Sequence, residues 1–377
     1  MEIIRFELLK ISDIILISAL IGVFIIQIFY IIRYFKLVRH SDGEPNEKPT
    51  QVTIIVSVRN EEEHIHAIVE KFNMQQFENY QVLVINYCSE DNTGGILSYL
   101  AENNPRLKVT SLSQETRFSE KQAINIGMKG ASSPWIILLT SATGELKPEW
   151  LTNMCNLLTP ETDILVAYTN VERAKGFRNL ICRLERFQQF LISGAWTLAG
   201  SPFVFNENNV LFKKSMYFDT LGFRHKLNRN FANLELIFNE NIKNGKVVIT
   251  TNPDLAIREK IDDDRGDHIR LLKKGVQIRQ SLSLPKKIGL FLDDFTRIIF
   301  PALAATVIIL HPEYWITFSV FPFILLILLA IMIKMLINRL NERKIFLSSL
   351  VYILIKPLIN WWFFWSMYII HRRSRWN

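Results

Sequence analysis

The sequence predicts an α/β domain with a mostly parallel sheet, flanked by apolar segments that are long enough to cross a membrane. Apolar runs of strand length alternate with amphipathic helical patterns between about residues 50 and 290. This alternation is typical of parallel sheets covered by helices. Long apolar runs occur near both ends of the 377-residue chain, whereas the middle has the composition of a soluble domain.

The first apolar run, residues 14–35, is predicted to anchor the chain in a membrane, within an N-terminal segment of residues 1–39. A span needs about 20 apolar residues. A cleaved signal peptide is the alternative, but the run is too long and no small-residue cleavage site follows. Arg33, Lys36 and Arg39 follow its most apolar part. By the positive-inside rule, the central domain then faces the cytoplasm from the inner membrane.

The net charge of +8 comes largely from basic residues near the apolar runs, which fits attraction to anionic lipid headgroups. Binding of nucleic acid would require a basic stripe with stacking aromatic residues on the central domain, and the sequence shows none. The three cysteines, Cys88, Cys155 and Cys182, suit no metal site by their spacing and indicate a reducing compartment.

The core strands are predicted from apolar segments bounded by polar residues. Residues 52–58 are apolar almost throughout rather than alternating, which indicates a central parallel strand. Further strands are expected at residues 82–86, 107–110, 135–139, 163–169, 208–214 and 246–250.

Helices are predicted between these strands from their capping residues and apolar faces. Asp91 is expected to cap one helix, and Ser119 with Gln122 has the spacing of a capping box. Pro148 stands near the first position of another helix. Other helices are expected at residues 62–74, 177–192 and 231–243, the second with Arg178, Arg183 and Arg186 on its polar side.

The C-terminal part is predicted to lie at and in the membrane. Residues 268–294 mix basic and apolar residues, as in an interfacial amphipathic segment. Membrane helices are expected within residues 295–377, from the apolar runs 298–310, 315–337 and 345–370. Three full crossings would place Arg372, Arg373 and Arg375 outside, so the number of spans stays open.

Five segments of the central region, in order and at matching spacing, resemble family 2 glycosyltransferases, the GT-A fold enzymes that include membrane-bound sugar transferases. They are VTIIVSVRNEEEHI, VLVINYCSEDNT, EKQAINIG, WIILLTSATGELKPEWL and NNVLFKKSMYFDTLGF. The resemblance covers about residues 50–290. It implies a Rossmann-like GT-A domain at residues 51–267, after a polar linker at 40–50, that moves a sugar from a nucleotide-sugar donor to an envelope glycan or lipid-linked acceptor.

The resemblance also shows which family residues are missing. The family's Asp-x-Asp motif holds Mg²⁺ or Mn²⁺, but Ser141-Ala142-Thr143 stands there, and hydroxyls bind these cations weakly. The family's base position is occupied by Asn233, which leaves Glu235 as the fallback base. Gln280 stands where the family has Trp in the Gln-x-x-Arg-Trp motif, and an Asn-Tyr pair replaces the nucleoside-binding aspartates.

The remaining matches imply contacts with the donor, each beside a plainer alternative. Asn60 and Glu61 are also an ordinary helix start, and Lys121 an ordinary helix lysine. Glu145, two residues beyond the missing pair, could supply one metal ligand, but a solvated loop acid is the favoured interpretation. The expected donor-binding residues are Asn60, Glu61, Asn86, Asp91, Lys121, Asn125, Ser141 and Thr143.

Two functions therefore remain open from the sequence. One is a working transferase without the usual metal, in which Lys121 or nearby arginines offset the diphosphate charge and Glu235 is the base. The other is a catalytically degenerate glycosyltransferase that binds or scaffolds other glycan-assembly proteins. A transporter or channel is disfavoured, because the C-terminal helices are few and hold little polar content.

Overall fold

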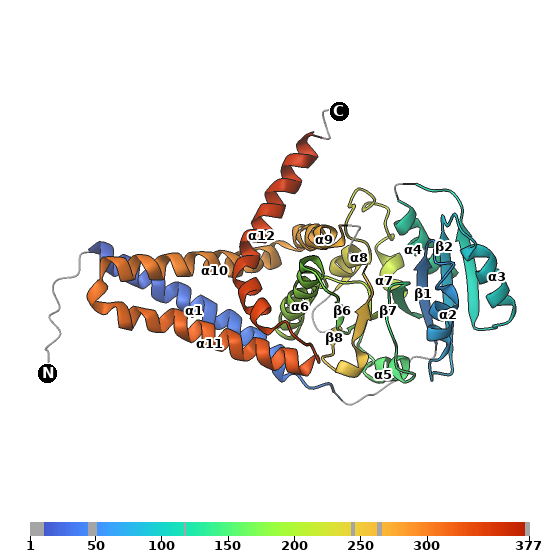
Figure 1. The fold of residues 1–377 in the computed structure, drawn as a ribbon, viewed down its shortest axis with the longest axis horizontal. Helices are drawn as coiled ribbons and strands as arrows, with labels where there is room; N and C mark the ends of the chain where they lie inside the picture. The colour runs from blue at the N-terminus through green and yellow to red at the C-terminus, as the bar shows by residue number, and fades with distance from the viewer. Residues whose placement is uncertain (1–10, 44–50, 117, 243–245, 262–265, 374–377) are drawn as a thin grey trace. The chain divides into compact units, whose positions relative to one another are not determined.

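The computed structural model describes residues 11–43, 51–116, 118–242, 246–261 and 266–373. The chain forms two compact units. The first holds the helices at the two ends of the chain, and the second consists of Arg39–Leu282 with Arg339–Asn341 (Figure 1). Residues 44–50 of the predicted linker lie outside the described residues.

The second unit is built on a mostly parallel sheet. Its described strands follow the order β3-β2-β1-β4-β7-β5-β8, with β7 antiparallel to both of its neighbours. Their bounds are β1 Val52–Val58, β2 Tyr80–Tyr87, β3 Leu107–Leu112, β4 Trp135–Thr140, β5 Ile164–Val166, β7 Val210–Lys213 and β8 Val247–Ile249. The strands predicted at residues 52–58, 82–86, 107–110 and 135–139 are confirmed, with small changes at their ends.

The order of the strands reverses beside β1. From β1 the chain continues to β2 and β3 on one side, and then crosses to β4 on the other. The register aligns Val58 with Asn86 of β2 and Ser57 with Thr140 of β4. The carboxyl ends of β1, β2 and β4 therefore meet at the point where open α/β sheets bind ligands.

The prediction of a single strand at residues 163–169 is wrong in one respect. The segment contains parts of two strands, and these belong to two different sheets. After β5, the chain enters β6 (Thr169–Val171), which pairs in parallel with β9 (Ile257–Glu259). The side-chain amide of Asn209 donates to the carbonyl of Tyr168 at 3.0 Å. The same carbonyl accepts from the Ile257 main-chain amide of β9 at 3.0 Å, so from Tyr168 onward the main chain pairs with β9 instead of with the large sheet.

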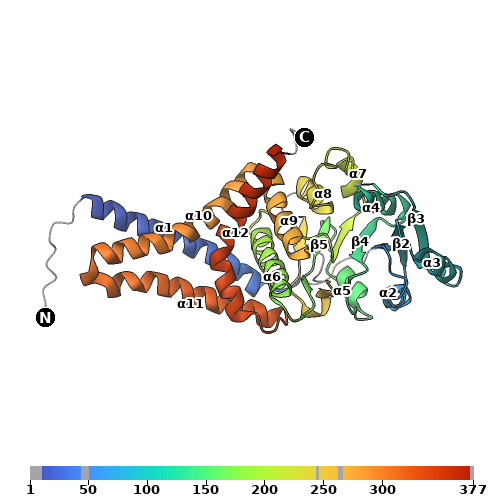
Figure 2. The same ribbon diagram turned by 45° about the horizontal axis from the view of Figure 1, so that its top comes forward.

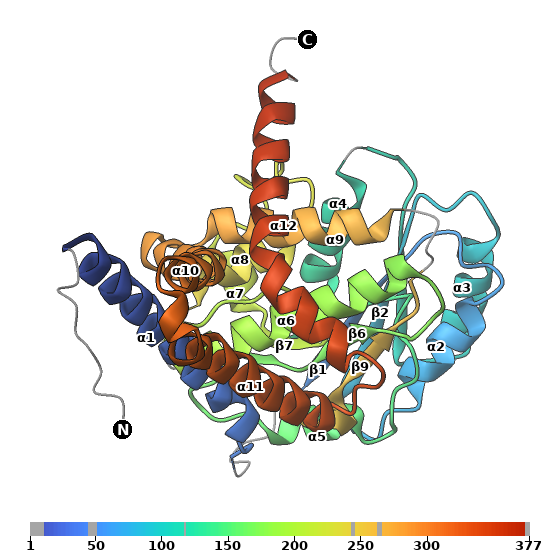
Figure 3. The ribbon, with the colours of Figure 1, turned by 60° about the vertical axis from the view of Figure 1, so that its left-hand side comes forward.

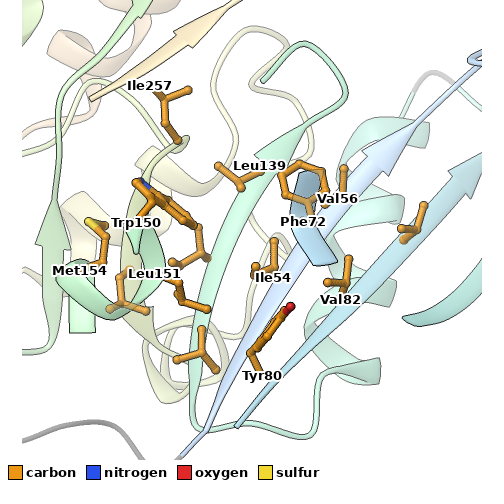
Figure 4. Packing of buried hydrophobic residues seen from close by; sticks show 14 of the residues in the cluster. Ile54, Val56, Phe72, Tyr80, Val82, Leu139, Trp150, Leu151, Met154 and Ile257 are labelled. Atoms are coloured by element: carbon orange, nitrogen blue, oxygen red, sulfur yellow. The ribbon is translucent and has the colours of Figure 1, made fainter. Parts of the chain in front are cut away.

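Helices cover both faces of the large sheet. Ile54 and Val56 pack with Phe72 and Trp150 on one face (Figure 4). Ile55 points to the other face, where a Cβ on Gly127 would come within 2.8 Å of its side chain. The helices are α2 Ile65–Asn73, α3 Thr93–Glu102, α4 Ser119–Gly130, α5 Trp150–Asn156, α6 Phe177–Leu198, α7 Ser215–Asp219, α8 Leu234–Asn241 and α9 Asp267–Ser281. Figure 2 shows α6, α8 and α9 grouped together, apart from α2 and α3.

Two details of the helices differ from prediction. The capping box of Ser119 and Gln122 does not form, because the Gln122 side chain instead accepts from the Thr116 hydroxyl at 3.1 Å. The polar side of α6 is not solvated as a whole, since Arg183 and Arg186 are buried and only Arg178 is exposed. Arg186 makes an ion pair with Glu259 at 3.1 Å, so neither it nor Arg183 is available to lipid phosphates.

The first unit contains α1 Ile11–Arg39, α10 Leu284–Leu310, α11 Trp315–Arg339 and α12 Phe346–Arg373, seen from the side of α1 in Figure 3. Among the described residues, three helices are long and apolar enough to cross a membrane: Ile11–Arg39, Pro312–Arg339 and Phe346–Ile369. Helix α10, which contains the apolar run at residues 298–310, is not one of them, and the number of C-terminal spans was left open by the sequence. The predicted interfacial segment is divided, since α9 belongs to the second unit and α10 to the first.

A buried polar network connects three helices of this first unit. The Arg297 guanidinium donates to the Asp293 carboxylate at 2.7 Å, to the Tyr34 hydroxyl at 3.2 Å and to the Ile353 carbonyl at 3.2 Å. Gln27 donates to the Thr296 hydroxyl at 2.6 Å. Buried charges are tolerated when they are paired in this way, and here the pairing connects α1, α10 and α12.

We predict that Trp150→Ala lowers the free energy of unfolding of the second unit by about 3–5 kcal/mol, because Trp150 is buried in the main core. Thermal and denaturant unfolding of the protein in detergent measures the change. Tyr99→Ala is the control, since Tyr99 is 63% exposed and its replacement should change stability by no more than about 0.5 kcal/mol. Equal losses in the two variants would contradict the described core.

Candidate functional site

The loops that follow β1 and β2 are connected by hydrogen bonds at the carboxyl edge of the sheet. The Asn60 side-chain carbonyl accepts from the Glu90 amide at 2.9 Å, and the Asn60 amide donates to the Ser89 hydroxyl at 3.0 Å. Asn60 has a φ of 54°, a left-handed conformation that asparagine tolerates better than most residues. The Asn86 side chain accepts from the Ser89 hydroxyl at 2.5 Å.

Asp91 completes this connection. Its carboxylate accepts from the Glu62 amide at 3.0 Å, the Thr93 amide at 3.1 Å and the Thr93 hydroxyl at 2.6 Å. Thr93 in turn accepts from the Glu61 amide at 2.9 Å. Desolvation acts to raise the pKa of Asp91, but these hydrogen bonds outweigh it and lower the pKa. Four expected donor-binding residues, Asn60, Glu61, Asn86 and Asp91, therefore lie together on two mutually fixed loops.

The end of β4 lies beside them and is held by the segment around β9. The Lys260 amide donates to the Ala142 carbonyl at 2.7 Å, and the Gly144 amide donates to the Arg258 carbonyl at 2.7 Å. A Cβ on residue 144 would come within 2.4 Å of that Arg258 carbonyl oxygen, so the close approach requires glycine. Thr143 is buried and forms an isolated bridge with Glu259.

The residues at this strand end do not fit a divalent cation. Ser141 and Thr143 offer neutral hydroxyls, whereas Mg²⁺ and Mn²⁺ prefer carboxylate oxygens. Among the described residues, no group of three or more His, Cys, Asp and Glu side chains is placed to hold a metal ion. Glu145 is exposed and lies in the loop beyond the strand. The Mg²⁺ or Mn²⁺ expected from the resemblance therefore has no ligand set here.

A second group of expected residues lies on α4 and α8. The Lys121 ammonium is buried and donates to the Asn233 side-chain oxygen at 3.0 Å and to the Arg229 carbonyl at 2.6 Å. Lys121 is therefore not an exposed helix lysine. The Asn125 side chain accepts from the Tyr217 hydroxyl of α7 at 3.0 Å, which favours a packing role for Asn125.

Glu235, the expected fallback base, is fully buried within an ionic cluster. It forms an ion pair with Lys274 of α9, and its other oxygen accepts from the Asn233 amide at 3.0 Å. Lys274 also pairs with Glu207 at 3.2 Å. Glu207 accepts in addition from the Leu234 amide at 2.8 Å. One lysine thus compensates two buried carboxylates.

The pKa values of the two carboxyl groups in this cluster are shifted in opposite directions. Burial, followed by the charge of Glu207, raises the pKa of Glu235 to about 7. Burial also acts to raise the pKa of Glu207, but Lys274 and the amide donors of Leu234 and Asn233 outweigh it and lower the pKa. At neutral pH Glu207 is therefore ionised, while the pKa of Glu235 lies close to the pH.

Sequence reasoning missed the partners in this cluster. Glu207 stands in no recognised motif position, and Lys274 belongs to a basic run that was interpreted as facing lipid. Gln277, which remains from an incomplete family motif, accepts from the amides of Phe231 and Ala232, both at 3.0 Å. The cluster depends on the packing of α9 against α8, and the sequence pattern does not predict that packing.

Comparisons with known proteins agree with the fold. Residues 53–218 match the family model for glycosyl transferase family 2. No curated protein matches the chain. A solved mannosyltransferase from Pyrobaculum calidifontis, in complex with GDP-Man and Mn²⁺, aligns at 18% identity over 92% of this chain and 97% of its own, with a TM-score of 0.55. S. aureus TarS 1–349 aligns at 13% identity over 86% and 92%, with a TM-score of 0.43.

We predict that Lys274→Met lowers the free energy of unfolding at pH 8 by roughly 3–5 kcal/mol, because Glu207 and Glu235 lose their shared counter-ion. Without Lys274, both carboxyl groups have higher pKa values folded than unfolded, so the folded state loses stability as pH rises. The defect should therefore shrink at pH 5, as followed by thermal unfolding.

The neighbouring substitution Lys273→Met is the control. Lys273 lies over the Phe231 ring at 5.5 Å and makes no ion pair with a described residue, so its loss should cost no more than about 1 kcal/mol at either pH. A Lys274→Met defect that is the same at pH 5 and pH 8 would contradict the ionic cluster.

Proposed function

We propose that this chain, whose residues 53–218 match the glycosyl transferase family 2 model, transfers a sugar from a nucleoside diphosphate donor to an envelope glycan or lipid-linked acceptor. The observation that supports this most is the meeting of β1, β2 and β4 at the switch point of the sheet. The two loops there are fixed to each other by side-chain hydrogen bonds. They supply the preorganised polar edge that nucleotide binding needs.

In the proposed reaction, an oxygen of the acceptor hydroxyl attacks the anomeric carbon of the donor sugar. The bond from that carbon to the diphosphate oxygen breaks, and the nucleoside diphosphate leaves with the electron pair. The proton of the hydroxyl passes to the ionised carboxylate of Glu235, whose pKa of about 7 suits a general base. Because Lys274 pairs with Glu235, it must move aside before the carboxylate can meet the acceptor.

We place the reaction at the cytoplasmic face of the inner membrane. Three candidate membrane helices support attachment to a membrane. Arg33, Lys36 and Arg39, at the end of α1, support the cytoplasmic orientation of the domain that follows.

A second candidate is a catalytically degenerate subunit that binds other glycan-assembly proteins. It is favoured by the pairing of Glu207 and Glu235 with Lys274, which leaves neither carboxylate free for chemistry in this structure. The neutral residues of the β4 end favour it as well. A subunit of this kind needs the fold and the membrane anchor, but not a base or a metal.

A transfer assay separates the two candidates. Purified protein in lipid nanodiscs is incubated with radiolabelled UDP- and GDP-sugars, membrane lipid extract as acceptor, and excess EDTA. Transfer that EDTA does not reduce, and that falls at least about 100-fold in Glu235→Gln, is the expected result, since removing a general base costs 10²–10⁴-fold. Glu102→Gln is the control, because Glu102 is exposed at the end of α3.

Binding of a donor without transfer to any acceptor would favour the degenerate subunit. Failure of the wild-type protein to bind any nucleotide sugar would contradict the transferase. Transfer that Glu235→Gln leaves unchanged would remove Glu235 from the mechanism, while leaving the reaction class intact.

A further inference from the structure

We propose that the ammonium groups of Lys71 and Lys260 bind the diphosphate of the donor at the end of β4, where family members hold a metal ion. The inference rests on the proposed function, because it names what receives the diphosphate of a nucleotide sugar. It goes further by assigning the charge to two lysines that the sequence does not single out. Lys121, which was expected in this role, is instead bound to Asn233 and Arg229.

Both lysines donate hydrogen bonds to the Ser141-Ala142-Thr143 segment, Lys71 through its side chain and Lys260 through its main chain. Lys71 comes from α2, and its ammonium donates to the carbonyl of Thr143. Lys260 follows β9, and its main-chain amide donates to the carbonyl of Ala142 at 2.7 Å. Three elements that are distant in the sequence therefore bring two cations to the strand end that lacks carboxylates.

The electrostatics of the pair are consistent with an anionic ligand. Burial lowers the pKa of Lys71, and the charge of Lys260 lowers it further, whereas Glu145 and Glu61 act in the opposite direction. A multiply charged anion that lies between two ammonium groups offsets the repulsion between them. Lys260 is exposed, so its ammonium is accessible to a ligand from solution.

Three other basic residues of this unit pair with carboxylates. Arg59 pairs with Glu115 at 2.6 Å, and Arg270 pairs with Glu120 at 2.6 Å. Lys274 is held by the two buried glutamates. Among the residues that the structure describes, Lys71 and Lys260 make no ion pair, so their charge is available to a diphosphate.

Replacing a metal ion by lysines changes how the affinity for a nucleoside diphosphate depends on chelator and on salt. A lysine ammonium binds phosphate as a point charge and needs no second component. Affinity for a nucleoside diphosphate should then be independent of chelator and should fall as salt screens the charges. The loss of aspartates at residues 141 and 143 is compatible with this arrangement, because carboxylates there would themselves neutralise the lysines.

The test is calorimetric titration of the full-length protein with UDP and GDP, in excess EDTA, at low and moderate salt. Wild type should bind one of them without a divalent cation. Lys260→Met and Lys71→Met should each weaken binding by about tenfold, the loss expected for one charge-assisted hydrogen bond. Lys260→Arg should retain most of the affinity, and Lys108→Met, at an exposed position of β3, should change nothing.

Thermal unfolding of each variant shows whether that variant is folded. Lys260→Met is the more informative variant, because the Lys260 side chain is exposed. Wild-type binding in EDTA that both methionine variants retain would overturn the assignment to lysines, while leaving the proposed transferase in place. Binding that appears only with Mn²⁺ would overturn it as well. Absence of any nucleotide binding by wild type would overturn the proposed function together with this inference.

Discussion

Strand β1 is hydrogen-bonded along its length to β2 on one side and along most of it to β4 on the other, both in parallel. Its side chains are buried on both faces, against Phe72 and Trp150 on one and α4 on the other. The position of the loop after β1 is therefore set by pairing and packing rather than by the loop itself. This constraint brings the ends of β2 and β4 to the same edge, and every candidate site residue there depends on it.

The structure explains how such a domain keeps its fold while its acidic motifs change. The residues that build the sheet are apolar and buried, whereas Ser141 and Thr143 stand at a strand end that main-chain bonds to residues 258 and 260 hold in place. Carboxylates at that end would serve a ligand, not the core. Neutral residues at these two positions are compatible with the observed packing, and they do not offer the carboxylate oxygens that a divalent cation prefers. Between α8 and α9, Lys274 compensates Glu207 and Glu235, so these three residues form an ionic cluster whose charges are paired with one another.

The sequence was sufficient for features that depend on local pattern. Continuous apolar runs identified β1, β2 and β4, and their polar ends indicated the ligand-binding edge. It was insufficient where distant segments determine the structure. After β5 the chain pairs with β9, Arg186 is buried beside Glu259, and the Gln122 side chain bonds to Thr116 rather than to Ser119. The surroundings of Glu235 and the approach of Lys71 to Thr143 likewise join residues that no periodicity connects.

In this account, a domain that resembles family 2 glycosyltransferases keeps the polar sheet edge that we propose binds the nucleotide, without residues that suit a metal ion. Electron paramagnetic resonance of Mn²⁺ tests it most directly, with the ion titrated into the protein in the presence and absence of a nucleoside diphosphate. We predict that the free-Mn²⁺ signal decreases no more with protein and nucleotide together than with the nucleotide alone. Stoichiometric loss of that signal, requiring the protein and abolished by Ser141→Ala with Thr143→Val, would contradict the claim.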